Sequence, residues 1–166
     1  MSDASLILLM LGLLMLAAWH DIATRLIPDG LCLAVLLVSL ALRVPVGWPA
    51  LLASLGVGCM LFCALLALAM RGFLGGGDVK LAGALVVAMP PAAAWDFLVA
   101  TVLAGGVLAA GYLAAARFAP RSPGGHGLLG RVLAVEAWRI RRRGPLPYAV
   151  AIAAGGAVAL LGSPGP

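Results

Sequence analysis

The chain has 166 residues, of which 64% are hydrophobic and 10% are charged, and its formal net charge is +5. Its mean hydropathy is +1.14. Soluble domains have about 45–50% apolar and about 25% charged residues, so this composition excludes a water-soluble globular protein. The length suits one membrane-embedded domain over residues 1–166.

Six apolar segments follow one another along the chain. They lack the alternating polarity of barrel strands, and a lipid-exposed strand needs a closed barrel, so each predicts a helix. We therefore expect an all-α integral membrane protein with six transmembrane helices. The first helix is not interpreted as a cleaved signal peptide, because the only early charge is Asp3. The predicted helices are about 4–19, 30–42, 49–70, 79–89, 94–116 and 146–162.

The first connection reads "HDIATRLIPDG" and carries two acids, Asp21 and Asp29. Taken alone, Asp21 is a polar residue at the end of the first helix. Asp29 is interpreted as the polar cap of the second helix, and not as a catalytic acid.

The third connection contains "GFLGGGDVKLAG", with Gly75, Gly76 and Gly77 before Asp78. The glycines permit a tight turn and close approach of another backbone. Taken alone, Asp78 is the N-cap of the following helix. The 11 residues between Asp78 and Pro90 extend about 17 Å as a helix, against about 30 Å of hydrocarbon. Asp78 is therefore expected within membrane depth, unless the bilayer thins around it.

The basic residues predict the orientation. If the first, third and fifth connections face the cytoplasm, they hold 10 of the 11 Lys and Arg residues, and only Arg43 lies outside. Basic loops stay in the cytoplasm, so both termini are expected outside. This topology explains the basic pI without nucleic-acid binding. The long cytoplasmic loop 117–145 is expected to bind anionic lipids through an amphipathic helix, with contact to a protein substrate as the alternative.

Asp21 and Asp78 are both predicted at cytoplasmic helix ends. Short hairpin connections let these ends meet. Two carboxylates in a partly dry site do not both ionise, so one keeps a proton while the other acts as a base. Such a pair can activate water and protonate a leaving amine. The two histidines, His20 and His126, assemble no metal cluster, and no cofactor is expected.

Three blocks of the sequence resemble the prepilin peptidases, which are membrane aspartic proteases of the GxGD type. "GGGDVKLAGAL" resembles their GxGD-K motif, "HDIATRLIPDGLCL" their other aspartate motif, and "GPLPYAVAIAAGG" the Pro-Tyr start of their last helix. The resemblance implies a GxGD-type helix bundle in the bacterial inner membrane. It implies removal of the leader from type IV prepilins on the cytoplasmic side, usually after a glycine.

By the same resemblance, Asp21 and Asp78 are the catalytic acids, and Gly75 and Gly77 are the motif glycines. Lys80 matches the motif lysine. Its expected role is either snorkelling to the interface or electrostatic tuning of the acids.

The chain lacks the insert with paired CxxC motifs found in larger members. It therefore resembles the short form of tight-adherence (Tad/Flp) pilus systems, for which we expect cleavage without methylation. Three alternatives stay open: a noncatalytic subunit of a secretion machine, a small transporter, and a presenilin-type peptidase. A scaffold should tolerate replacement of the aspartates by asparagine.

Overall fold

The computed structural model describes residues 3–118, 135 and 146–162, and its regular elements there are helical. Six α-helices occupy these ranges, and a single 3₁₀ turn, Val44–Val46, follows the second. The helices are α1 (Asp3–Thr24), α2 (Asp29–Arg43), α3 (Trp48–Met70), α4 (Gly76–Val86), α5 (Pro91–Phe118) and α7 (Tyr148–Gly162).

The prediction of an all-α protein with six helices at these places is confirmed, with changes at the boundaries. The end of α1 moves furthest, from the predicted residue 19 to Thr24. α4 is shifted as a whole: it begins at Gly76 and ends at Val86 where the sequence predicted 79–89. It ends early because Pro90 and Pro91 follow, and a residue before proline is biased away from helical geometry. The predicted loop 117–145 and its amphipathic helix lie outside the described residues, apart from 117–118 at the end of α5 and Val135.

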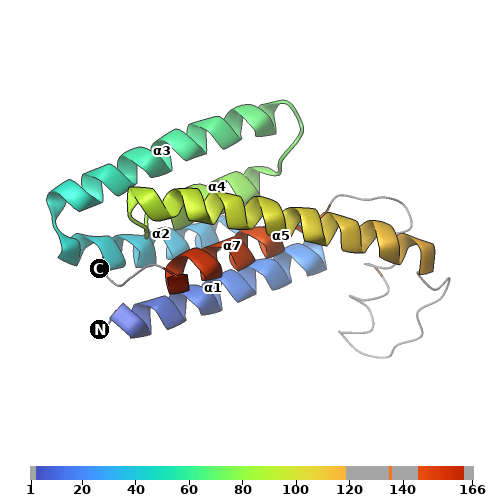
Figure 1. Ribbon diagram of the computed structural model, residues 1–166, viewed down its shortest axis with the longest axis horizontal. Helices are drawn as coiled ribbons and strands as arrows, with labels where there is room; N and C mark the ends of the chain where they lie inside the picture. The colour runs from blue at the N-terminus through green and yellow to red at the C-terminus, as the bar shows by residue number, and fades with distance from the viewer. Residues whose placement is uncertain (1–2, 119–134, 136–145, 163–166) are drawn as a thin grey trace.

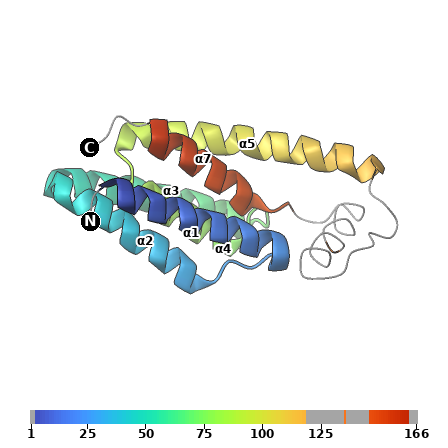
Figure 2. The ribbon, with the colours of Figure 1, turned by 90° about the horizontal axis from the view of Figure 1, so that it is seen from below.

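α4, the shortest helix with 11 residues, and α7, with 15, occupy the interior of the bundle. α4 packs against α2, α3 and α7, and α7 packs against α1, α4 and α5. Figure 1 shows α3 and α4 side by side, and Figure 2 shows α7 between α1 and α5. Neighbours on several sides explain why α4 and α7 are largely buried, whereas α3 and α5 keep wide exposed faces.

Small residues let α7 approach α5 closely. A Cβ atom added at Gly155 would lie 2.7 Å from the backbone nitrogen of Thr101 and 2.9 Å from its Cα atom. The same device brings α3 against α4, where a Cβ atom on Gly58 would lie 2.7 Å from the Val87 side chain. Membrane helices use small residues in this way because lipid gives them no hydrophobic drive to associate.

A buried polar contact joins α2, α3 and the turn after α4. Arg43 Nε donates to Ser54 Oγ at 3.1 Å, and Ser54 Oγ donates to the Met89 carbonyl at 2.8 Å. Arg43 and Ser54 are both buried. Because buried polar groups need partners, this contact fixes the two hairpins relative to each other at the Arg43 end.

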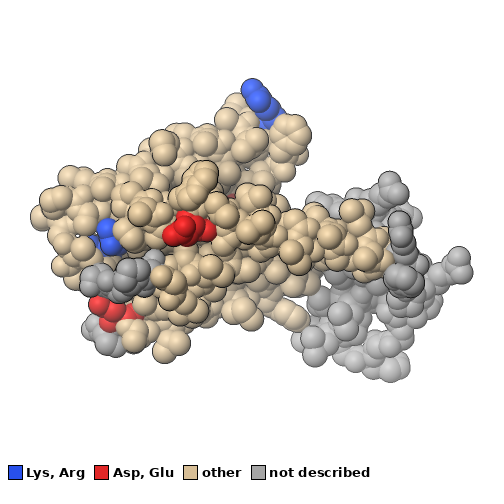
Figure 3. All heavy atoms as spheres, in the orientation of Figure 1, with Lys and Arg blue, Asp and Glu red and all other residues tan. Residues whose placement is uncertain are grey.

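Within the described ranges, four helices are long and apolar enough to cross a membrane: α1, α2 with its 3₁₀ turn, α3, and α5. α7 is a shorter apolar helix, and α4 is shorter still with 11 residues. Many large apolar side chains are exposed, and the face in Figure 3 carries few charged side chains among its described atoms. The chain is a multi-pass membrane protein; spanning by α4 and α7 remains a prediction.

Candidate active site

Asp21 lies in the last turn of α1 and is only 6% exposed. Its Oδ2 atom accepts a hydrogen bond of 3.1 Å from the backbone nitrogen of Ala149, in the first turn of α7. A buried carboxylate needs such donors because it has lost its water. The first aspartate motif and the Pro-Tyr block therefore meet, although 128 positions separate the two bonded residues.

Asp78 lies in the first turn of α4 and is half-buried. The N-cap residue is Gly75, so the expectation that Asp78 is the N-cap is wrong. The Gly75 backbone hydrogen-bonds the Asp78 carboxyl group, as an acid at the third helical position does when it reaches back to the cap. The other oxygen, Oδ1, is buried without a hydrogen-bond partner.

The two aspartates are electrostatic neighbours, which the sequence predicted from hairpin geometry. The Asp78 carboxyl group interacts with the charges of Asp21 and Arg25, and burial removes much of its solvent. Two carboxyl groups that repel each other in a partly dry site are suited to share one proton.

Arg25 ends α1 in an unusual conformation. Its φ of 60° makes it the one non-glycine residue with a left-handed backbone among the described residues. Its backbone nitrogen donates to the Asp21 carbonyl at 2.9 Å, which closes the last turn of α1. The chain then turns toward α2, and the guanidinium group remains near Asp78. The sequence did not predict this placement of Arg25.

Two of the three glycines before Asp78 are required for space, and none of them has a positive φ. A Cβ atom on Gly75 would lie 2.9 Å from Asp78 Oδ2, and one on Gly77 would lie 3.1 Å from the Cβ atom of Ile27. A Cβ atom on Gly76 would meet nothing within 4 Å. Contacts therefore explain the GxGD pattern. Gly75 lies against the Asp78 carboxyl group and Gly77 lies against Ile27 of the Ile-Pro-Asp segment, whereas position 76 has room for a side chain.

Lys80 forms an ion pair with Asp29, which was not predicted from the sequence. Lys80 Nζ lies 2.7 Å from Asp29 Oδ1, and both side chains are exposed. The expectation that Asp29 caps α2 is wrong, because the N-cap residue is Pro28. The ion pair joins the start of α2 to the start of α4, beside the contact between Cys32 Sγ and the Gly77 carbonyl at 3.9 Å.

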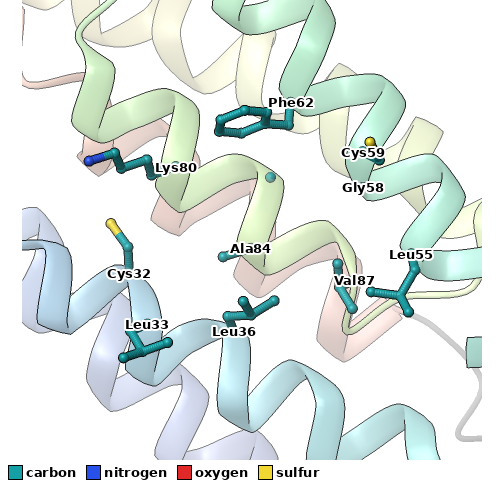
Figure 4. Close-up of a pocket in the computed structure, with 11 residues that line it drawn as sticks. Cys32, Leu33, Leu36, Leu55, Gly58, Cys59, Phe62, Lys80, Ala84 and Val87 are labelled. Carbon is teal, nitrogen blue, oxygen red and sulfur yellow. The ribbon is translucent and has the colours of Figure 1, made fainter.

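An apolar pocket of about 400 Å³ lies between α2, α3 and α4. Figure 4 shows Cys32 and Leu36 on one side, Cys59 and Phe62 on another, and Lys80 at one end. Lys80 and Asp78 are two positions apart on α4, so their side chains leave the helix about 200° apart. The pocket therefore opens on a different side of α4 from the Asp78 side chain.

The described residues contain no group of three or more His, Cys, Asp or Glu side chains that could hold a metal ion. Within this part of the chain, the available chemistry is that of two carboxyl groups, one guanidinium group and backbone amides at helix starts. The role of the Ala149 amide had a signal in the sequence: α7 begins after proline, without the Ser, Thr, Asp or Asn that usually caps a helix.

The geometry agrees with the comparison to protein families. The model of the type IV leader peptidase family matches residues 8–113. The match includes both aspartates and the glycine motif, and it ends before α7. Comparison with curated proteins and with solved structures gave no match. Because the family model covers more than half of the 166 residues, the chain belongs to the type IV leader peptidase family.

Proposed function

We propose that this chain is a membrane aspartic endopeptidase that removes the N-terminal leader of Flp-like type IV prepilins. Family membership supports leader peptidase activity in general. The aspartic mechanism is supported by one observation above the others: Asp21 and Asp78, from helices far apart in sequence, interact at one end of the bundle. Hydrolysis of a peptide bond needs a base for water and an acid for the leaving nitrogen, and two carboxyl groups sharing a proton supply both.

The proposed enzyme lies in the bacterial inner membrane with its active site at the cytoplasmic edge and both termini outside. The distribution of basic residues supports this orientation. The basic loop would lie against anionic lipids. The proposed reaction ends at cleavage and uses no cofactor. The lack of an insert with paired CxxC motifs in the sequence supports the short Tad/Flp-like form.

The paired aspartates argue against the rival functions. A noncatalytic subunit has no need for two interacting acids, one of them buried and the other half-buried. A small transporter places polar residues near the midplane and often contains internal repeats, whereas these acids lie at helix ends and no repeat is visible in the sequence. A presenilin-type peptidase shares the acid pair, but the Ile-Pro-Asp and Pro-Tyr blocks favour the prepilin branch.

The test is co-expression with a Flp-like prepilin, followed by N-terminal sequencing of the product. We expect the leader to be removed at one bond before the apolar segment of the prepilin. The matched control is the same membrane preparation carrying the Asp78→Asn variant. A prepilin that stays intact beside well-expressed wild-type enzyme would exclude this substrate class.

A further inference from the structure

The start of α7 shows that Asp21 caps another helix. The first amides of a helix have no partner within it, and the side chain of the preceding residue usually accepts from one of them. Here the preceding residue is Pro147, which is buried and has no acceptor in its side chain. The amide of Ala149, the second residue of α7, donates instead to Asp21 Oδ2 at 3.1 Å.

This contact favours the charged form of Asp21. A hydrogen bond from an N–H group to an ionised oxygen is stronger than one to a neutral oxygen. The N-terminus of α7 also carries a partial positive charge, which attracts an anion in its first turn. Both effects act on a side chain that is almost fully buried, where screening by water is weak.

The two carboxyl oxygens of Asp78 lie in different environments. Asp78 too lies in a first helical turn and bonds to the Gly75 backbone, so the helix terminus and one hydrogen bond favour its charged form as well. Its Oδ1 atom, however, is buried without a partner. An unpartnered buried oxygen costs more when it is charged, so the neutral carboxyl form suits this position.

We propose that Asp21 enters the reaction ionised and acts as the base, whereas Asp78 enters it protonated and acts as the acid. The Ala149 amide at the start of α7 determines which of the two is ionised. This inference rests on the proposed peptidase function. Asp21 takes a proton from water, and the resulting hydroxide forms a bond to the scissile carbonyl carbon. The C–N bond breaks as Asp78 gives its proton to the leaving nitrogen. The products are an acid and an amine, and transfer of the proton from Asp21 to Asp78 restores the starting state.

The other ionisable groups at this end of the bundle bear on the titration of the pair. Among the described residues, they include Arg25, whose charge acts on Asp78, and Lys80 and Asp29, which pair with each other. Arg71 follows α3 at the same end. Cys32 lies against the Gly77 carbonyl, and Tyr148 is directed toward Gly105 of α5. His20 precedes Asp21 on α1. All of them stay unchanged in the experiment.

The experiment removes the Ala149 N–H and measures kcat/KM for prepilin cleavage against pH. An amide-to-ester replacement at Ala149 deletes the donor and keeps the side chain. Ala149→Pro deletes it by another route, and proline is tolerated in a first helical turn. The matched control is the ester replacement at Val150, whose amide bonds the Pro147 carbonyl at 3.1 Å. Each variant is compared with wild type by size-exclusion chromatography in detergent.

We expect the acid limb of the pH profile to move upward by about one to two pH units in both Ala149 variants. Without the donor, Asp21 binds a proton more readily and ceases to act as a base at a higher pH. The alkaline limb should stay in place, because it reports loss of the Asp78 proton. The Val150 control should show unmoved limbs.

The inference would be overturned if the Ala149 variants eluted like wild type in size-exclusion chromatography and the acid limb of their pH profiles did not move. An upward move of the alkaline limb alone would overturn it as well, because the protonated residue of the pair would then be Asp21. Inactivity at every pH would also overturn it. Without the donor, Asp21 should still act as a base at any pH above its raised acid limb. Failure of wild-type enzyme to cleave at any pH would instead reject the proposed function.

Discussion

Asparagine has nearly the size of aspartate and keeps one acceptor oxygen, but it cannot take up or release a proton at ordinary pH. Asp21→Asn and Asp78→Asn should therefore each abolish leader removal, because acid–base groups contribute about 10²–10⁴-fold each. The double variant should be little worse than either single one, since the two groups act as a unit. The measurement is a gel shift of the prepilin in membranes that carry each variant.

The control for this series is Asp29→Asn. The Asp29 carboxylate pairs with Lys80 on the exposed edge of the site, and exposed ion pairs contribute little. Leader removal should stay within a few-fold of wild type. Normal processing by either of the other single variants, or its loss only through degradation of the enzyme, would exclude that aspartate from the mechanism.

The glycine triplet gives a second prediction at the residue scale. Gly75→Ala should lower kcat by about 10²-fold if it displaces the Asp78 carboxylate by about 1 Å, because the new Cβ atom would lie 2.9 Å from Oδ2. The fold should be kept, because the end of a side chain can move. Cleavage kinetics and thermal unfolding, measured on the same preparation, separate the two effects.

Gly76→Ala is the matched control, since its Cβ atom would meet nothing within 4 Å. It should cleave like wild type. Gly77→Ala should fall between the two, because Ile27 must move by a few tenths of an ångström. Equal activity of all three variants would contradict the explanation of the motif by space.

At the scale of elements, α7 is held by its close approach to α5. Gly155→Ala should destabilise the bundle by about 1–3 kcal/mol, because the added methyl group would overlap the Thr101 backbone, which cannot turn aside. Thermal unfolding in detergent micelles measures the loss. Since α7 also supplies the Ala149 amide to Asp21, cleavage should decline with stability.

Gly111→Ala, on the open face of α5, is the control. A Cβ atom there would meet nothing within 4 Å, and alanine favours a helix over glycine by about 0.5–1 kcal/mol. It should unfold at or above the temperature of wild type. If Gly155→Ala were as stable as Gly111→Ala, the contact between α5 and α7 would not require a small residue.

At the scale of the whole molecule, the testable property is orientation in the membrane. Ten of the 11 basic residues lie in connections assigned to the cytoplasm, so a reporter fused at residue 125 should be cytoplasmic and one at residue 164 periplasmic. Fusions with alkaline phosphatase and with a fluorescent protein give opposite signals on the two sides. Reporters on the same side would mean that 146–162 does not cross the membrane.

The sequence by itself determined the class of the protein and most of its helices. Apolar residues this abundant must face lipid, and the proline and glycine clusters divide them into segments. Local composition was therefore enough to predict a membrane protein and the approximate positions of its helices. The resemblance of three short blocks also led to Asp21, Asp78, Gly75 and Gly77. The start of α4 was misplaced by three residues, because Gly76 and Gly77 usually break helices and here form the first turn.

Contacts between distant segments were decided only by the tertiary structure. No local pattern shows that Asp29 pairs with Lys80, that Gly77 faces Ile27, or that Arg25 lies near Asp78. The clearest case is α7, whose missing cap was visible after Pro147 but whose acceptor lies 128 positions away. Sequence determines which groups need a partner, because burial and helix ends create that need. Packing of the helices determines which partner they find.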